Sequence, residues 1–334
     1  MATPAHLEPS KLGTKEYWDA LYTTELANHA HDPSDTGTAW FDDSDASDKI
    51  VTFLSDVSRA GLPGVGVDAD VDVDVNVETT SFLDLGTGNG ALLFALRDDG
   101  WAGPMLGVDY SPQSVRFARR IERARRKGER STGGDDGDDE GQGETIAEEE
   151  EQEQEEAEEE VDVHFAEYDI LHDPATALLD ARFSPSAPAG WDVVLDKGTF
   201  DAVSLSAETL LDQAATDTSA GPRPRRLNEA YGSRILPLVR EGGLFLVTSC
   251  NWTEAELRSW FEDGAVQEVP AAPFTSTSTS TSASSSEQQQ NNEKTSSWGF
   301  EAVGRIEYRS FSFGGVKGQT ISTLCFRKRL RVRS

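Results

Sequence analysis

The sequence predicts an α/β fold in which a doubly wound, mostly parallel sheet is closed by a C-terminal antiparallel hairpin. Three observations predict this fold. Short apolar runs alternate with runs of helical period along most of the chain, which is the pattern of strands joined by crossover helices. A glycine-rich turn, FLDLGTGNG, contains the first of these apolar runs. Two β-rich runs joined by the short connection GGVKGQ lie near the end of the chain.

The expected elements follow one another in a regular order after residue 81. The strands are expected at 82–85, 105–109, 161–165, 191–195 and 243–249, and the helices at 91–98, 113–127, 227–239 and 253–261. A crossover helix between successive strands makes them parallel. The last two β-rich runs, EAVGRIEYRSFSF and TISTLCFRK, are separated by a glycine-bearing connection and therefore predict the antiparallel hairpin.

Three low-complexity segments are expected to lie outside the core. Residues 61–80 are rich in Val and Asp, 130–160 form an acidic insertion, and 268–297 form an insertion rich in Ser, Thr and Gln. The strict Val/Asp alternation in 61–80 also fits a half-buried strand, which is the alternative to a surface loop there. The segments separate an N-terminal helical part, 1–60, expected to contribute to the substrate and cofactor site, from a main domain, 81–330.

The formal net charge of −30 is concentrated in the acidic insertion. Residues 133–160 hold 16 acidic residues and no basic one, so the remaining chain carries −14. Spread over the folded surface, a charge of −30 would argue strongly against nucleic acid as a partner, but the remaining chain is acidic without being extreme. We expect no direct nucleic-acid partner. Six arginines crowd the 113–127 helix, but that helix leads directly into the acidic insertion, so we expect a solvated or self-neutralised face rather than an RNA-binding one.

The start of the chain and its cysteines indicate a soluble intracellular protein. The first residues lack the basic start and apolar run of a secretory signal, and no window approaches the roughly 20 apolar residues that a membrane span needs. Cys250 and Cys325 each lie in an apolar β-like run, which suits reduced, buried thiols better than a disulfide or a metal site. We expect a cytoplasmic monomer without a metal, with the nucleus as a second location.

The glycine-rich turn predicts a cofactor site. Gly86, Gly88 and Gly90 follow a strand at two-residue spacing and precede a helix, so the backbone can approach a ligand without Cβ atoms in the way. The spacing differs from the G-x-G-x-x-G of diphosphate binding, and Asp84 stands two residues before the first glycine. A carboxylate disfavours a diphosphate but favours a sulfonium and an α-ammonium group, so the turn indicates S-adenosyl-L-methionine.

Acidic residues at the ends of the next two strands complete the predicted cofactor site. Asp109, followed by Tyr110, ends the second strand, where a carboxylate can accept hydrogen bonds from both ribose hydroxyls of an adenosine. Asp169 and Ile170 end the third strand, where they would bond the adenine amine and cover the adenine ring. An ordinary capping role for Asp169 is the alternative.

Several longer motifs resemble one family, the lysine methyltransferases of translation elongation factor 1A. LGTKEYWDALYTTEL, the pair Trp40-Phe41, WDVVLDKGTFDAVSLS, LVREGGLFLVTSCNWTEAEL and GGVKGQTIS carry the likeness, which covers most of the chain outside the low-complexity segments. The resemblance implies a seven-stranded, Rossmann-like class I methyltransferase that uses S-adenosylmethionine to methylate a lysine of elongation factor 1A. The acidic and Ser/Thr-rich insertions depart from the family's pattern.

Methyl transfer to a lysine requires alignment of the donor with a neutral amine and exclusion of water. Asp196 and Lys197, in the DKGT segment that follows the fourth strand, are the candidates for organising the transfer site, and a structural capping role for Asp196 is the alternative. Aromatic candidates for closing over cofactor or lysine are Tyr17, Trp18, Trp40 and Trp252, and Trp252 is taken as a catalytic candidate because it follows the fifth strand.

Two other functions remain open from the sequence alone. One is a class I methyltransferase that acts on a small molecule or on another protein, because the cofactor motifs do not identify the acceptor. The other is a non-catalytic interaction module whose acidic insertion binds basic partners. The intact pattern of Asp84, Gly86, Gly88 and Asp109 argues against the second.

Overall fold

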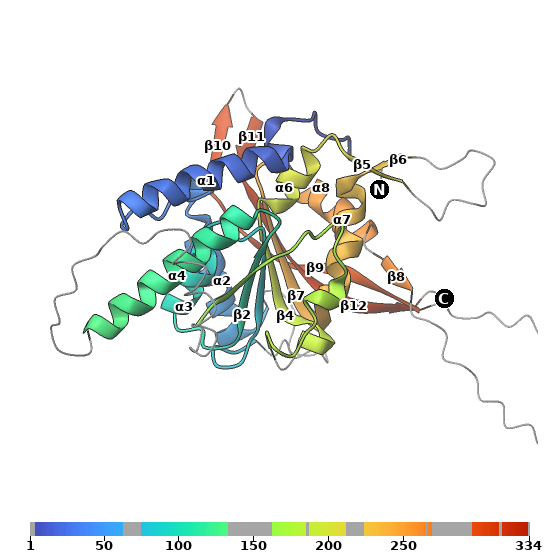
Figure 1. The fold of residues 1–334 in the computed structure, drawn as a ribbon. Helices are drawn as coiled ribbons and strands as arrows, with labels where there is room; N and C mark the ends of the chain where they lie inside the picture. The colour runs from blue at the N-terminus through green and yellow to red at the C-terminus, as the bar shows by residue number, and fades with distance from the viewer. Residues whose placement is uncertain are drawn as a thin grey trace, which may run out of the picture.

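The computed structural model confirms the predicted sheet (Figure 1). It describes residues 4–62, 75–132, 162–184, 187–211, 224–264, 266–268, 296–313 and 316–332. The strand order is β3-β2-β1-β4-β7-β12-β9-β8. The bounds are β1 Phe82–Leu85, β2 Met105–Asp109, β3 His164–Glu167, β4 Trp191–Lys197, β7 Val239–Ser249, β8 Val266–Glu268, β9 Ser296–Ile306 and β12 Ser322–Val332. Seven of these strands form the predicted sheet, and the short β8 adds an eighth at its edge.

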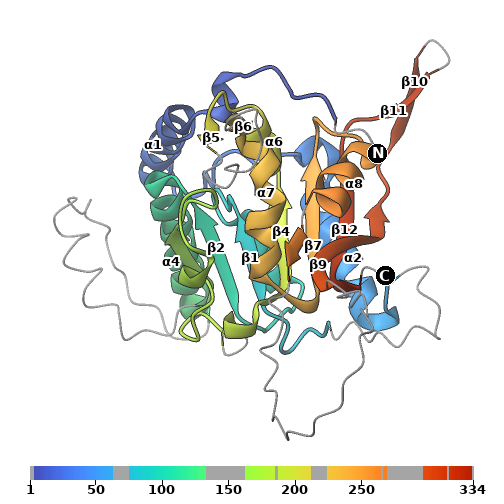
Figure 2. The same cartoon turned by 90° about the vertical axis from the view of Figure 1, so that its right-hand side faces the viewer.

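The strand directions agree with the predicted doubly wound sheet and its closing hairpin. β1 runs parallel to β2 and β4, and β4 runs parallel to β7. β12 is antiparallel to both β7 and β9. The connection between β9 and β12 was expected to be short, but it holds a second ribbon, β10 (Ser310–Phe313) paired with β11 (Val316–Gln319), which projects from the end of the sheet (Figure 2).

Helices cover both faces of the sheet. Figure 2 shows α7 in front of it and α2 behind. The bounds are α1 Lys15–His31, α2 Ala46–Ala60, α3 Ala91–Asp98, α4 Pro112–Thr132, α6 Thr199–Ser204, α7 Leu227–Ile235 and α8 Glu254–Arg258. Side chains of a strand alternate between its faces, so Phe82 packs in the cluster that contains α2, α3 and α4, whereas Leu83 packs in the cluster that contains α6, α7 and α8. The strands are consequently buried on both sides, as parallel strands usually are.

Three predicted elements differ in detail. The 227–239 helix ends at Ile235 and a 3-10 turn, Leu236–Leu238, follows, because Pro237 has no N–H to continue the helical hydrogen bonds. The strand β7 therefore begins at Val239, four residues earlier than expected. The 253–261 helix is split into α8 and a π-helical turn, Ser259–Asp263.

Besides the β10–β11 ribbon, four elements were not anticipated from the sequence. The helix α6 begins at Thr199, inside the DKGT segment, where no helix was predicted. A small ribbon of β5 (Thr209–Leu211) and β6 (Pro224–Arg226) pairs on its own between α6 and α7, and β8 pairs with β9.

The low-complexity segments lie mostly outside the described residues. The structure does not describe positions 63–74, 133–161 and 269–295. The predictions for segments 61–80, 130–160 and 268–297 therefore lie mostly outside the described residues. In the N-terminal part, α1 packs against α4 (Figure 2), and α2 packs against α3. Among the described residues, no helix combines the length and the apolar character that crossing a membrane requires.

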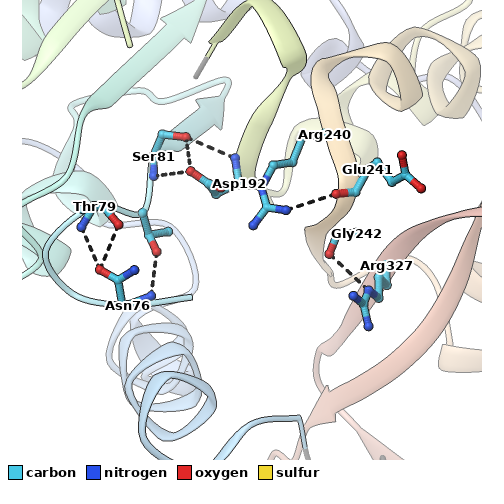
Figure 3. Close-up of polar contacts among 9 residues, drawn as sticks. Asn76, Thr79, Ser81, Asp192, Arg240, Glu241, Gly242 and Arg327 are labelled. Carbon is cyan, nitrogen blue, oxygen red and sulfur yellow. Dashed lines mark hydrogen bonds and ion pairs between the residues drawn. The ribbon is translucent and has the colours of Figure 1, made fainter. Parts of the chain in front are cut away.

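Polar contacts fasten the amino ends of the central strands (Figure 3). The Ser81 hydroxyl and backbone N–H, just before β1, donate to the Asp192 carboxylate at 2.6 and 2.8 Å, and Asp192 also pairs with Arg240 at the start of β7. The Arg327 guanidinium donates to the Gly242 carbonyl at 3.1 Å. These contacts hold the amino ends of the strands together. The loops at the opposite, carboxyl ends can therefore bind a ligand without also having to stabilise the sheet.

Candidate functional site

A cavity of about 500 Å³ opens at the carboxyl ends of β1, β2, β4 and β7. This is the edge at which open α/β sheets bind ligands. Its walls come from two parts of the chain: the loops that follow the strands, and the N-terminal segment from Leu12 to Asp43. The wall surface is mostly apolar, although charged side chains such as Asp109, Lys197 and Asp201 are among the lining residues. An apolar cavity with a few fixed polar groups is the usual form of a small-molecule site.

The glycine turn forms one wall of the cavity. Gly86, Gly88 and Gly90 all have positive φ, at 65°, 60° and 79°, which is the left-handed region that side chains disfavour. Gly86 lines the cavity, and a Cβ there would lie only 2.1 Å from the Thr199 hydroxyl. That hydroxyl donates to the Leu85 carbonyl at 2.6 Å, so the glycine turn and the start of α6 are packed together. Gly88 and Gly90 lie behind the wall, against Tyr22 and Phe165.

Asp84 lies directly beneath the glycine turn. Its side chain is buried, and burial raises its pKa to about 6, while the nearby Lys197 ammonium opposes the rise. Asp84 does not itself line the cavity. The protein between Asp84 and the cavity has a lower dielectric constant than water. The negative charge of Asp84 therefore attracts a cationic ligand in the cavity more strongly than it would across water.

Asp109 lines the cavity at the end of β2 and is held rigidly. One carboxylate oxygen accepts from Ser111 N–H at 2.9 Å, and the other accepts from the Ser114 hydroxyl at 2.8 Å and from Gly88 N–H at 3.2 Å. Burial raises its pKa, and these hydrogen bonds oppose that rise. The structure thus brings the glycine turn and the second-strand acid together, as the sequence predicted.

The residues after β3 also line the cavity. Ile170 does so with an apolar side chain, beside Tyr168. Asp169 lines the cavity too, but its carboxylate accepts from Leu171 N–H at 2.9 Å and lies 2.8 Å from the His172 ring nitrogen. These bonds give Asp169 the capping role that was the alternative, while leaving it beside any ligand. Tyr110 also lines the cavity, and the Lys15 ammonium lies 5.5 Å from the centroid of its ring.

The structure places Asp196 away from the cavity. Its side chain points into the sheet's second core cluster, where it accepts from the Tyr231 hydroxyl at 2.7 Å. It also accepts from Thr199 N–H at 2.8 Å and from Phe200 N–H at 3.0 Å, which are free N–H groups in the first turn of α6. Burial raises the pKa of Asp196 to about 7. These bonds correspond to the capping alternative, and an organising role of Asp196 in methyl transfer stays a prediction.

Lys197 takes the opposite direction and lines the cavity. Its ammonium donates to the Trp40 carbonyl at 3.1 Å and lies 5.9 Å from the centroid of the Phe41 ring. Burial lowers the pKa of Lys197, and the Asp84 and Asp196 carboxylates oppose that change. Lys197 therefore joins the strand end to the N-terminal wall.

The aromatic candidates divide into two groups. Trp18 and Trp40 line the cavity and meet edge to face with ring centroids 5.2 Å apart. Tyr17 packs on Trp18 outside the lining. Trp252, which was taken as a catalytic candidate, is buried, donates to the Ser204 hydroxyl at 3.1 Å and packs on Phe200, so its observed contacts are those of a core residue.

Sequence reasoning did not single out several lining residues. Asp201 on α6 accepts from Cys250 N–H at 2.8 Å and thereby fixes the turn after β7. Partial burial and the Asp201 carboxylate raise the pKa of the Cys250 thiol to about 12, so this thiol stays protonated and is a poor nucleophile. Asp43 and Ile321 come from distant parts of the chain. Asp201 and Cys250 lie within the motifs DKGTFDA and TSCNWT, which were the available signal.

The cavity fits a cationic nucleoside ligand. Gly86 presents its backbone to the cavity, and the buried Asp84 beneath the glycine turn favours positive charge. Asp109 offers a fixed acceptor that suits a vicinal diol, and Ile170 offers an apolar surface for a flat ring. The N-terminal aromatic wall would exclude water from the remaining part of the cavity.

Comparison with known proteins shows extensive similarity. A model described as a methyltransferase domain matches residues 76–130, which contain the glycine turn and β2. The chain is 31% identical to protein-lysine N-methyltransferase EFM4 of Saccharomyces cerevisiae over 98% of this chain and 99% of that protein. It is 33% identical to efm4 of Schizosaccharomyces pombe over 76% of this chain and 82% of that protein. EEF1A lysine methyltransferase 2 of Homo sapiens is 24% identical over 96% and 88%.

Proposed function

The chain belongs to the family of protein-lysine N-methyltransferases that includes these fungal relatives, and we propose that it transfers a methyl group from S-adenosylmethionine to a lysine of elongation factor 1A. The observation that carries the proposal is the cavity in which the glycine turn and Asp109 meet an aromatic N-terminal wall. The acceptor is proposed from the relatives, because two mammalian proteins and a fish protein named EEF1A lysine methyltransferase 2 match 96% of this chain.

The residues divide the cavity into a cofactor part and an acceptor part. Asp109 would hold the ribose, Ile170 would cover the adenine, and Gly86 would admit the methionine end of the cofactor, whose cationic groups Asp84 would attract. When bound, S-adenosylmethionine supplies a methyl group on a positively charged sulfur, which a neutral amine can attack directly. The acceptor lysine would reach it beneath Trp40 and Phe41.

The chain's own contribution to the chemistry is alignment and desolvation. A lysine ammonium has a reference pKa near 10.4 and must lose a proton before its nitrogen can attack. Entry into an apolar cavity disfavours the ammonium form and so promotes that loss. Asp43, an exposed carboxylate at the rim of the cavity, would attract the incoming cationic side chain. The largest share of the rate would come from holding amine and methyl group in line.

Transfer of labelled methyl groups into purified elongation factor 1A tests the proposal. Wild-type protein should label one lysine-containing peptide of the factor and should leave a panel of unrelated proteins unlabelled. Label in a different protein or a small molecule would retain the methyltransferase and discard the acceptor. An absence of S-adenosylmethionine binding by the folded protein would discard the cofactor assignment itself.

Cofactor affinity should depend on pH through Asp84. The pKa of this carboxyl is raised to about 6, so it is ionised above pH 6 and neutral below. Because only the ionised form attracts the cationic cofactor, affinity should be constant near pH 8 and fall below pH 6, approaching roughly tenfold per pH unit. Titration calorimetry between pH 5 and 8 would measure the profile, and Asp84→Asn should flatten its acid side. A parallel fall in both proteins would assign the dependence to another group.

A further inference from the structure

We propose that Lys197 is a positioning residue that holds residues 40–45, here called the strap, across the cavity so that the strap forms its acceptor-side wall. The consequence of this role for methyl transfer rests on the proposed function. The structural part of the role, the fastening of the strap by the partly buried Lys197, can be tested without any substrate.

Lys197 contacts the strap through one backbone carbonyl and one aromatic ring. Its ammonium donates to the Trp40 carbonyl at 3.1 Å, and the Phe41 ring lies over it at 5.9 Å. Gly198 follows with a φ of 95°, and a Cβ added there would lie 2.9 Å from the Phe41 ring. The Phe41 ring thus rests on a strand end that has been kept free of a side chain. A charged donor to a carbonyl makes a stronger hydrogen bond than a neutral one.

The strap's own backbone requires such a fastening. Phe41 and Asp45 have φ values of 63° and 52°, and they are the only non-glycine residues with positive φ in the described part of the chain. Side chains disfavour this conformation, which persists where the surroundings enforce it. Between these two residues lies a single 3-10 turn, in which Ser44 N–H donates to the Phe41 carbonyl at 3.2 Å.

The strap is held by three contacts, and Lys197 acts on its first two residues, Trp40 and Phe41. Trp40 meets Trp18 on α1, and the Ser44 hydroxyl lies 3.4 Å from the Thr320 hydroxyl before β12. Trp40, Phe41 and Asp43 all line the cavity. Because the Phe41 carbonyl accepts from Ser44 N–H and Ala46 N–H, loss of the Lys197 bond at Trp40 should loosen the strap from its first residues onward. The cofactor side, formed by the glycine turn and Asp109, would be left in place.

Hydrogen exchange of the strap amides tests the fastening directly. Lys197→Met removes the donor but keeps an unbranched side chain, and the amides of Ser44, Asp45 and Ala46 should then exchange about tenfold faster in the protein without cofactor. Lys328→Met is the matched control. Lys328 likewise donates to a backbone carbonyl (Val239, 2.7 Å) and lies 5.6 Å from an aromatic ring, but it is buried and lies by the amino end of β7, away from the cavity. That variant should leave strap exchange unchanged.

A second variant keeps Lys197 and displaces the strap by another route. Gly198→Ala should push the Phe41 ring away and accelerate exchange at the same amides, so the test remains valid if Lys197→Met is poorly folded. In methylation assays both variants should raise the KM for the protein acceptor at least fivefold, whereas the Kd for S-adenosylmethionine should change less than twofold. Unchanged strap exchange in folded Lys197→Met would overturn the proposal.

The exchange and activity measurements separate this inference from the proposed function. Faster strap exchange together with no methylation of elongation factor 1A by the wild-type protein would uphold the fastening and reject the acceptor. Faster exchange with an unchanged KM in an active enzyme would overturn the positioning role. Faster exchange with a raised KM and an intact cofactor Kd is the expected result.

Discussion

Replacing Asp109 by alanine is expected to weaken S-adenosylmethionine binding by at least about 100-fold. The carboxylate would accept from both ribose hydroxyls, and loss of two hydrogen bonds to a charged acceptor corresponds to roughly 3 kcal/mol. The substitution also leaves the Ser114 hydroxyl and Gly88 N–H without their acceptor, which loosens the glycine turn. Isothermal titration of the purified variant would measure the effect.

The control for Asp109→Ala is an acidic residue that lies outside the cavity. Asp98, at the end of α3, pairs with Arg125 on the surface. Asp98→Ala should bind the cofactor as the wild type does, because an exposed ion pair contributes little and lies away from the cavity. A folded Asp109→Ala that kept the wild-type Kd would show that the cofactor's ribose lies elsewhere.

The cofactor side could be predicted because its signal is local in the sequence. A glycine turn must directly follow its strand, and the acid that meets it must end the next strand, so Gly86 and Asp109 are fixed by spacing alone. The structure brings Gly88 N–H and Asp109 into one hydrogen bond, at 3.2 Å. The order of the strands was equally accessible, since crossover helices leave few topologies.

The acceptor side could not be predicted in the same way because it is assembled from distant segments. Asp43, Asp201 and Ile321 line one cavity but are separated by more than a hundred residues from one another. Their proximity depends on how α1 and α2 pack, which no local pattern encodes. The sequence also did not show which of two neighbouring side chains faces the cavity. Asp196 and Lys197 are adjacent on β4 and therefore point to opposite sides of the sheet.

Because Asp196 faces the core, we expect its replacement to lower the stability of the fold. Asp196→Ala removes the acceptor of three buried donors, from Tyr231, Thr199 and Phe200, and should lower the free energy of unfolding by about 3 kcal/mol. For a domain of this size the melting temperature should fall by roughly 10 °C. Tyr231→Phe removes one of these bonds and should cost about 1 kcal/mol. Thermal unfolding followed by circular dichroism would rank the two variants.

The pH dependence of the same residue distinguishes a core carboxyl from a catalytic one. Burial raises the pKa of Asp196 from 3.8 to about 7, so the folded state favours the protonated form, and the stability due to that preference is lost as the pH rises from about 4 to about 7. Asp196→Asn does not titrate, so its deficit in unfolding free energy relative to the wild type should be larger at pH 5 than at pH 8. Its affinity for S-adenosylmethionine should stay within about twofold of wild type, because the side chain faces away from the cavity. An Asn variant that was as stable as the wild type at both pH values, yet had lost turnover, would instead place this carboxyl in the chemistry of methyl transfer.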